Sequence, residues 1–197
     1  MLERFLQAHP ACAGPPIDEP PTPTQGGVRE AAGGRSFSDG LYRTHTEESS
    51  RRLFGEIDRT FPGAPPHTAP YGYDWLGRQF CARANHPDAT SLIFEPGTGE
   101  VLEVPVSFAA IHDKELVDYR NEALASDFYA AYLVARGQPP DSAQCVVYGI
   151  PLFLGGEDGV PSLELVDLDV YWHLTRQLIL KIKGLPPGTP IGSVVGG

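Results

Sequence analysis

The chain has 197 residues, a net charge of −10 and a pI near 4.9, and 41% of its residues are apolar. This length predicts one domain, or one domain with an arm. The acidic balance argues against direct nucleic-acid binding, which relies on Lys and Arg to neutralise phosphates. No run approaches the ~20 apolar residues of a membrane helix, and the N-terminus lacks the apolar core of a secretory signal. We therefore expect a cytoplasmic protein with no membrane contact.

The two ends of the chain have a composition unlike the middle. Residues 10–34 are dominated by Pro, Gly and Ala, with a single Ile and a single Val. Such a segment buries too little apolar surface to order itself. The sequence therefore predicts a disordered or loosely docked arm over 1–35, which tethers a short helix at 2–9. A flexible tail is predicted over 184–197, so the folded unit is expected over 36–183.

The first half of this unit predicts a helix followed by a hairpin. Thr46 is a plausible N-cap, and apolar residues recur at helical spacing until Pro62 ends the segment. Residues 78–83 and 90–95 are expected to form strands. The turn at Pro96–Gly99 would then return the chain as a further strand over 100–104.

The second half mixes helices and strands. A helical region is expected over 113–136, with a possible break at Ser126. Strands are expected over 145–153 and 162–168, and the segment 170–182 is expected to close the domain as a helix, although its apolar residues also alternate as in a strand. Because no βαβ regularity is present, the predicted class is α+β: a single domain with a mixed or antiparallel sheet packed by helices.

No motif for catalysis, metal binding or a cofactor stands out. Cys12, Cys81 and Cys145 are far apart and form no CxxC pair, so free thiols are favoured over a disulfide. The Gly155–Gly156 pair is followed by carboxylates where a phosphate loop needs a lysine. We expect no metal, no cofactor and no enzymatic activity. A hydrolase that uses scattered carboxylates remains an alternative.

The charge distribution is more informative. Between Gly137 and Thr175 there is no Lys or Arg. This span carries six carboxylates: Asp141, Glu157, Asp158, Glu164, Asp167 and Asp169. In a strand over 162–170, Leu163 and Leu165 would face inward, as would Leu168 and Val170 after a slip in phase. Glu164 and some of Asp167 and Asp169 would then face outward. The acids fit either an ordinary solvated face or a surface for a basic partner.

Four stretches in a characteristic order resemble a known family. They are FSDGLYRTH, YGYDWLGRQF, LIFEPGTGEVLEVPVSFAAIHDKEL and YGIPLFLGGEDGVPSLELVDLDVYW. Together they resemble the C-terminal domain of type VI secretion immunity proteins against DNase effectors, a family often preceded by a GAD-like domain. The resemblance covers about Ser36 to Leu180. The chain departs from the family at Ser162, where Asn is frequent, and in an upstream region that is reduced to an arm and about one helix.

This resemblance implies a non-enzymatic bacterial immunity protein that binds a cognate toxin, a nuclease, in interbacterial competition. Its oligomeric state does not follow. A basic toxin surface would then meet the acidic residues Glu157, Asp158, Glu164, Asp167 and Asp169. Structural roles are expected for Asp74, Trp75, Gly77, Arg78, Gly155, Gly156 and Trp172. The alternative is a regulatory or structural protein-binding module with no toxin partner.

Overall fold

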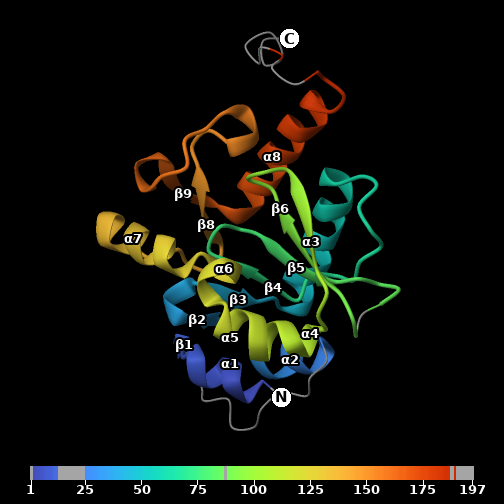
Figure 1. Cartoon of the computed structure of the whole chain (residues 1–197), viewed down its shortest axis with the longest axis vertical. Helices are drawn as coiled ribbons and strands as arrows, with labels where there is room; N and C mark the ends of the chain where they lie inside the picture. Colours follow the sequence, from blue (N-terminus) through green and yellow to red (C-terminus); the bar gives the residue numbers. More distant parts are fainter. Residues whose placement is uncertain (1, 13–24, 87, 187–188, 190–197) are drawn as a thin grey trace.

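An antiparallel sheet runs through the centre of the molecule (Figure 1). The computed structural model describes residues 2–12, 25–86, 88–186 and 189. Within them, the sheet has seven strands, each paired with its neighbours in sequence. The strands are β1 (Ala11–Cys12), β2 (Ser36–Phe37), β3 (Tyr42–Thr44), β4 (Gly72–Asp74), β5 (Gln79–Ala82), β6 (Ser91–Glu95) and β7 (Glu100–Val104). The two strands predicted over 90–95 and 100–104 are present as the paired strands β6 and β7, with Glu95 opposite Glu100 across the turn.

Helices cover both faces of this sheet. They are α1 (Glu3–Ala8), α2 (Gln25–Ala32), α3 (Glu47–Thr60), α4 (Phe108–Ala110), α5 (Leu116–Asp118), α6 (Arg120–Leu124), α7 (Ser126–Arg136) and α8 (Leu168–Ile182). A short π-helix at Ile111–Glu115 joins α4 to α5, and 3₁₀ helices lie at Ser38–Gly40, Leu152–Leu154 and Val160–Ser162. The predicted class, α+β, is confirmed.

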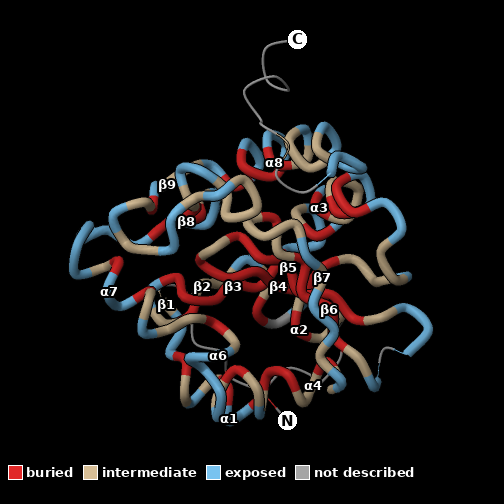
Figure 2. The backbone as a smooth tube through the Cα atoms, turned by 45° about the horizontal axis from the view of Figure 1, so that its top comes forward, coloured by how far each residue is buried: buried red, intermediate tan, exposed pale blue. Residues whose placement is uncertain are grey.

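The central strands of the sheet are buried (Figure 2), and the strand period of two divides their side chains between the two faces. Phe80 and Ile93 pack in one cluster with residues of α1, α2 and the region from α4 to α7. Their neighbours Cys81 and Leu92 pack in a second cluster with α3 and α8. The sheet is therefore the middle of three layers.

Two predicted helical segments are present with shifted bounds. Thr46 caps α3 as expected, because its side chain accepts a hydrogen bond from the backbone N–H of Ser49 at 3.1 Å. The helical region predicted over 113–136 begins earlier, where the Ser107 hydroxyl accepts from Ala110 N–H. The chain breaks at Ala125, which has φ 50°, so α7 starts at Ser126.

The prediction of a loose arm over 1–35 is wrong for residues 2–12 and 25–35. Leu2 and Phe5 are each 2% exposed and belong to the larger core cluster. The Phe5 ring lies 5.1 Å from that of Phe37, and β1 pairs with β2. A few large apolar side chains order this segment because they share a core with the rest of the domain, which average composition does not register. Residues 13–24 and most of the predicted tail lie outside the described residues.

A second, two-stranded sheet carries the segment singled out by its charge. Strand β8 (Gln144–Tyr148) pairs antiparallel with β9 (Leu163–Asp167), and we call the two strands with their connection the hairpin. The strand predicted over 145–153 ends at Tyr148, and Gly149 N–H donates to the Ser162 carbonyl oxygen instead. The closing segment is helical. Its start is fixed by Asp167, whose carboxylate accepts from the N–H groups of Asp169 and Val170.

Candidate protein-binding face on the hairpin and helix α8

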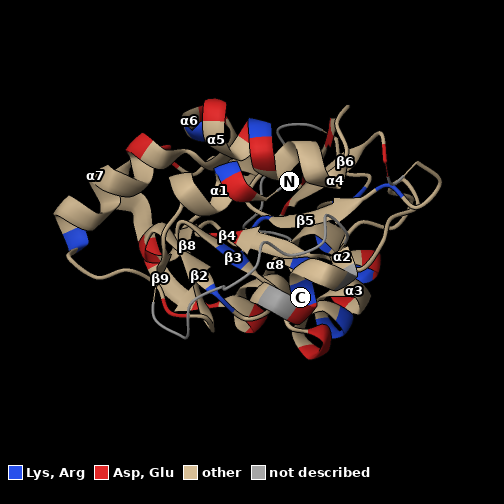
Figure 3. Cartoon of the chain, turned by 90° about the horizontal axis from the view of Figure 1, so that it is seen from below, with Lys and Arg blue, Asp and Glu red and all other residues tan. Residues whose placement is uncertain are grey.

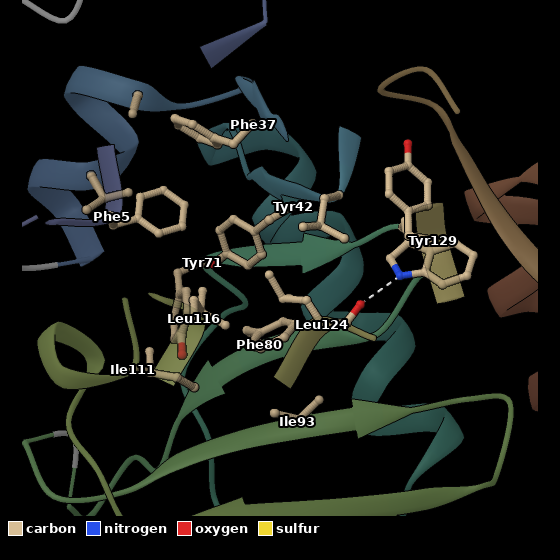
Figure 4. Packing of buried hydrophobic residues seen from close by; sticks show 14 of the residues in the cluster. Phe5, Phe37, Tyr42, Tyr71, Phe80, Ile93, Ile111, Leu116, Leu124 and Tyr129 are labelled. Atoms are coloured by element: carbon tan, nitrogen blue, oxygen red, sulfur yellow. Dashed lines mark hydrogen bonds between the residues drawn. The ribbon is translucent and has the colours of Figure 1, made fainter. Parts of the chain in front are cut away.

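The sequence motif around Asp74 serves the fold. Asp74 is fully buried, and its carboxylate lies 2.6 Å from the Nη2 of Arg78. Trp75 and Trp172 are fully buried, and their indole N–H groups donate to the carbonyl oxygens of Leu124, at 2.8 Å (dashed in Figure 4), and of Gly77, at 3.0 Å. These residues fix the sheet against both helical layers.

The glycine-rich stretch forms a turn in the hairpin connection. Gly155 adopts φ 84°, a conformation that side chains disfavour. A Cβ on Gly156 would collide with the carbonyl oxygen of Ile150. Glu157 and Asp158 are exposed beyond these glycines, and the Asp158 carboxylate accepts the Tyr148 hydroxyl at 2.8 Å. The turn therefore presents two carboxylates, one of which is held in place.

Figure 3 marks the acidic positions of the chain in red. The five predicted contact acids are all exposed, but they are not equivalent. Asp167 caps α8, and Asp169 lies 3.3 Å from the guanidinium of Arg52. Within the described part of the chain, Glu157 and Glu164 form no ion pair. The charge left for a partner is therefore concentrated on the hairpin, and Asp167 and Asp169 already have roles within the fold.

An apolar groove of about 200 Å³ lies between the hairpin and α8. The lining residues from the hairpin are Val147, Tyr148, Gly149, Pro151, Glu164 and Val166, and those from α8 are Val170, Tyr171, Leu174, Thr175 and Leu178. Val170 and Leu174 are each 53% exposed, and Ile150, next to the groove in sequence, is 61% exposed. We call the groove-lining residues together with Ile150 the hairpin–α8 face.

A second hollow, of about 350 Å³, lies on the other side of the Val170–Leu174 ridge. Arg52 and Glu56 of α3 line it together with Asp169 and His173. The two exposed apolar residues thus stand between two hollows. The sequence analysis expected a helix over 170–182 but assigned Val170 to an inward-facing position, so it did not identify this exposed ridge. The helical spacing of Val170, Leu174 and Leu178, opposite buried Tyr171 and Trp172, was the available signal.

Two buried cysteines and two buried histidines are held in their neutral forms. Burial raises the pKa of the Cys81 and Cys145 thiols, and burial lowers the pKa of His45 and His112 to about 4. No group of three or more His, Cys, Asp or Glu side chains in the described residues is arranged to hold a metal ion. The groove is smaller than the ~300–1,000 Å³ of typical small-molecule sites, and its size suits a side chain of a partner protein.

Comparison with known proteins adds information on the fold. No family model and no curated protein matches the chain. Among solved structures, it is similar to "Crystal structure of Atu4351 from Agrobacterium tumefaciens", with a TM-score of 0.61, 16% identity and 96% of each chain covered. At this identity the likeness concerns the fold alone. None of the helices in the described ranges has the length and apolar content that a bilayer span requires.

Proposed function

We propose that this chain is a bacterial immunity protein that binds a cognate toxin, a nuclease, in the cytoplasm and blocks it without catalysis. The observation that carries the proposal is the hairpin–α8 face, where half-exposed Val170 and Leu174 lie beside the unpaired carboxylate of Glu164. Interfaces of this kind combine a small apolar centre with a polar rim. The four sequence stretches that resemble the immunity family supply the class of partner.

Glu164 on this face and the carboxylates of the adjoining turn, Glu157 and Asp158, suit a nuclease. A nuclease needs a basic surface for the phosphates of its substrate, and an acidic protein can occupy that surface in their place. The hairpin offers this charge without a compensating Lys or Arg between Gly137 and Thr175.

Co-expression tests the proposal. The protein encoded beside this gene is expressed in Escherichia coli alone and together with the chain, and survival and plasmid integrity are measured. We expect toxicity that the chain suppresses. With purified proteins, inhibition of plasmid cleavage should stop at a fixed molar ratio, as binding requires.

Two results would argue against the proposal. If the chain inactivated a molar excess of the toxin, inhibition would be catalytic. If the neighbouring protein bound the chain but harmed no cell, the chain would be a regulatory or structural binding module.

A further inference from the structure

The outer edge of strand β9 presents backbone groups that the fold leaves unpaired. In the described residues β9 pairs with β8 alone, and Val146 lies opposite Leu165. Val146 N–H donates to the Trp75 carbonyl oxygen at 2.7 Å, so it faces away from β9. Opposed residues of an antiparallel pair point their N–H and C=O groups either both toward each other or both away. The N–H and C=O of Leu165 therefore point outward.

The backbone groups of Leu163 also point away from β8. Leu163 lies two residues earlier, and its carbonyl oxygen accepts a hydrogen bond from the Arg136 guanidinium at 3.0 Å. Arg136 thus closes the start of the edge from the end of α7. In the part of the chain that the structure describes, no loop or side chain makes the equivalent bond to the outward groups of Leu165.

Open space lies directly beside these groups. A hollow of about 380 Å³ is lined by Tyr132, Arg136 and Gln138 on one side and by Leu163, Glu164 and Leu165 on the other. An unpaired strand edge with room beside it is a template for a further strand.

The free carboxylate beside this edge favours a basic strand, whereas the Arg136 guanidinium at the start of the edge is held by the carbonyl oxygens of Pro161 and Leu163. Glu164 is exposed and forms no ion pair among the described residues, and a residue opposite it on an added strand would lie on the same face of the sheet. A second copy of this chain is a poor occupant, because each copy carries a net charge of −10. A cationic segment has no such repulsion.

We propose that β9 accepts an extended, basic segment of a partner protein as an added strand. The segment hydrogen-bonds through its backbone to Leu165, and one of its Lys or Arg side chains pairs with Glu164. This mode of binding rests on the proposed function only in that the same partner would supply the segment.

Hydrogen exchange of the full ¹⁵N-labelled chain tests the backbone pairing. The probe is a peptide of alternating Arg and Val, and its controls are a Glu–Val peptide and the Arg–Val peptide N-methylated on alternate amides. We expect the basic peptide at about 1 mM to slow exchange at Leu165 by about tenfold, and the two controls to have little effect. The amide of Val166, which faces β8, should change little.

Three results would overturn the pairing. Leu165 could exchange as slowly as Val166 in the free chain, which would mean that the edge is covered. The N-methylated peptide could protect Leu165 as well as its parent. Protection in the absence of peptide could rise with protein concentration, which would identify a second copy as the occupant.

A charge-reversal pair tests the role of Glu164. Glu164→Lys should weaken binding of the basic peptide by about tenfold, whereas Glu122→Lys on exposed α6 should leave it unchanged. Equal affinity of the Glu164→Lys chain and the parent would remove Glu164 from the proposal. Because no toxin enters this assay, peptide binding at β9 can be observed even if co-expression shows no protection. Conversely, protection in co-expression without peptide binding would contradict the role of the β9 edge and leave the proposed function intact.

Discussion

Single residues in the centre of the sheet carry polar groups that the fold has to satisfy internally. The Arg78 side chain is 9% exposed, and its guanidinium contacts the fully buried carboxylate of Asp74. Its Nη2 also donates to the Ala123 carbonyl oxygen at 2.7 Å, which ties the sheet to the helical layer above it. A charged pair of this kind specifies an arrangement, because the removal of either member leaves the other buried and unpaired.

Removal of Asp74 should therefore be severe. Asp74→Ala leaves the Arg78 guanidinium without its carboxylate and should lower the free energy of unfolding by about 3–5 kcal/mol. The matched control is Arg83→Ala, which breaks the exposed pair with Glu103 at 2.7 Å and should cost less than about 1 kcal/mol. Urea unfolding measures both. Similar losses in the two variants would show that the buried pair has no special role.

Buried histidines should make the protein sensitive to acid. His112 Nδ1–H donates to the Phe108 carbonyl oxygen, and its Nε2 accepts the Tyr42 hydroxyl, so the ring is neutral. Burial lowers the pKa of His45 and His112 to about 4, against 6.5 in the unfolded chain. Between these two pH values the unfolded chain binds more protons, so stability falls as pH falls, by roughly 1.4 kcal/mol per pH unit for each histidine.

Unfolding at several pH values measures this slope. His112→Gln should reduce the slope of the unfolding free energy against pH by the equivalent of about one proton between about pH 4 and 6.5. His86→Gln on the surface is the control. An unchanged slope in His112→Gln would show that the ring does not remain neutral in the fold.

At the scale of elements, the N-terminal segment is part of the domain. Helix α1 packs Phe5 against Phe37 and Tyr42, with ring centroids 5.1 and 5.6 Å apart. His9 is buried, and its Nε2 lies 2.7 Å from the Leu116 carbonyl oxygen. The segment therefore joins the start of the chain to its middle.

Loss of this packing should destabilise the whole domain. Phe5→Ala should cost about 3–5 kcal/mol, because it empties a site inside the main core, and a chain that begins at Ser36 should melt well below the parent. Glu3→Ala on the exposed side of the same helix is the control. Melting midpoints of the shortened chain and the parent that agree within about 5 °C would restore the interpretation of 1–35 as a dispensable arm.

Local signals predicted the elements that depend on local chemistry. Thr46 marks the start of α3, and the β6–β7 hairpin follows from its turn residues and flanking apolar strands. The N-terminal segment escaped prediction because its order depends on contacts with distant parts of the chain. The Val170–Leu174 ridge escaped prediction because Val170 was expected to face inward. The acids were found by charge, but their roles as cap, ion pair or free carboxylate depend on the positions of Asp167 and Arg52 in space.

At the scale of the whole molecule, charge is distributed unevenly. The hairpin carries unpaired carboxylates, while the arginines of α3 contact acids on α3 and α8: Arg51 with Glu47, Arg59 with Glu56 and Arg52 with Asp169. A molecule with a net charge of −10 attracts basic partners at long range, and the location of the unpaired acids sets the orientation in which they arrive.

Reversal of charge at the turn should therefore slow association more than the same change elsewhere. Glu157→Lys with Asp158→Lys should lower the association rate of the co-expressed toxin by about tenfold at low salt, and added salt should reduce the difference because screening acts over ~10 Å at 0.1 M. The stability should change by less than about 1 kcal/mol, since both side chains are exposed.

The control is Glu122→Lys with Asp127→Lys, which alters the net charge equally on exposed positions of α6 and α7. Stopped-flow kinetics at two salt concentrations separate local from global attraction. Equal slowing in both double variants would mean that net charge alone guides the encounter. An unchanged association rate in the Glu157→Lys, Asp158→Lys variant would mean that the contact lies away from this turn.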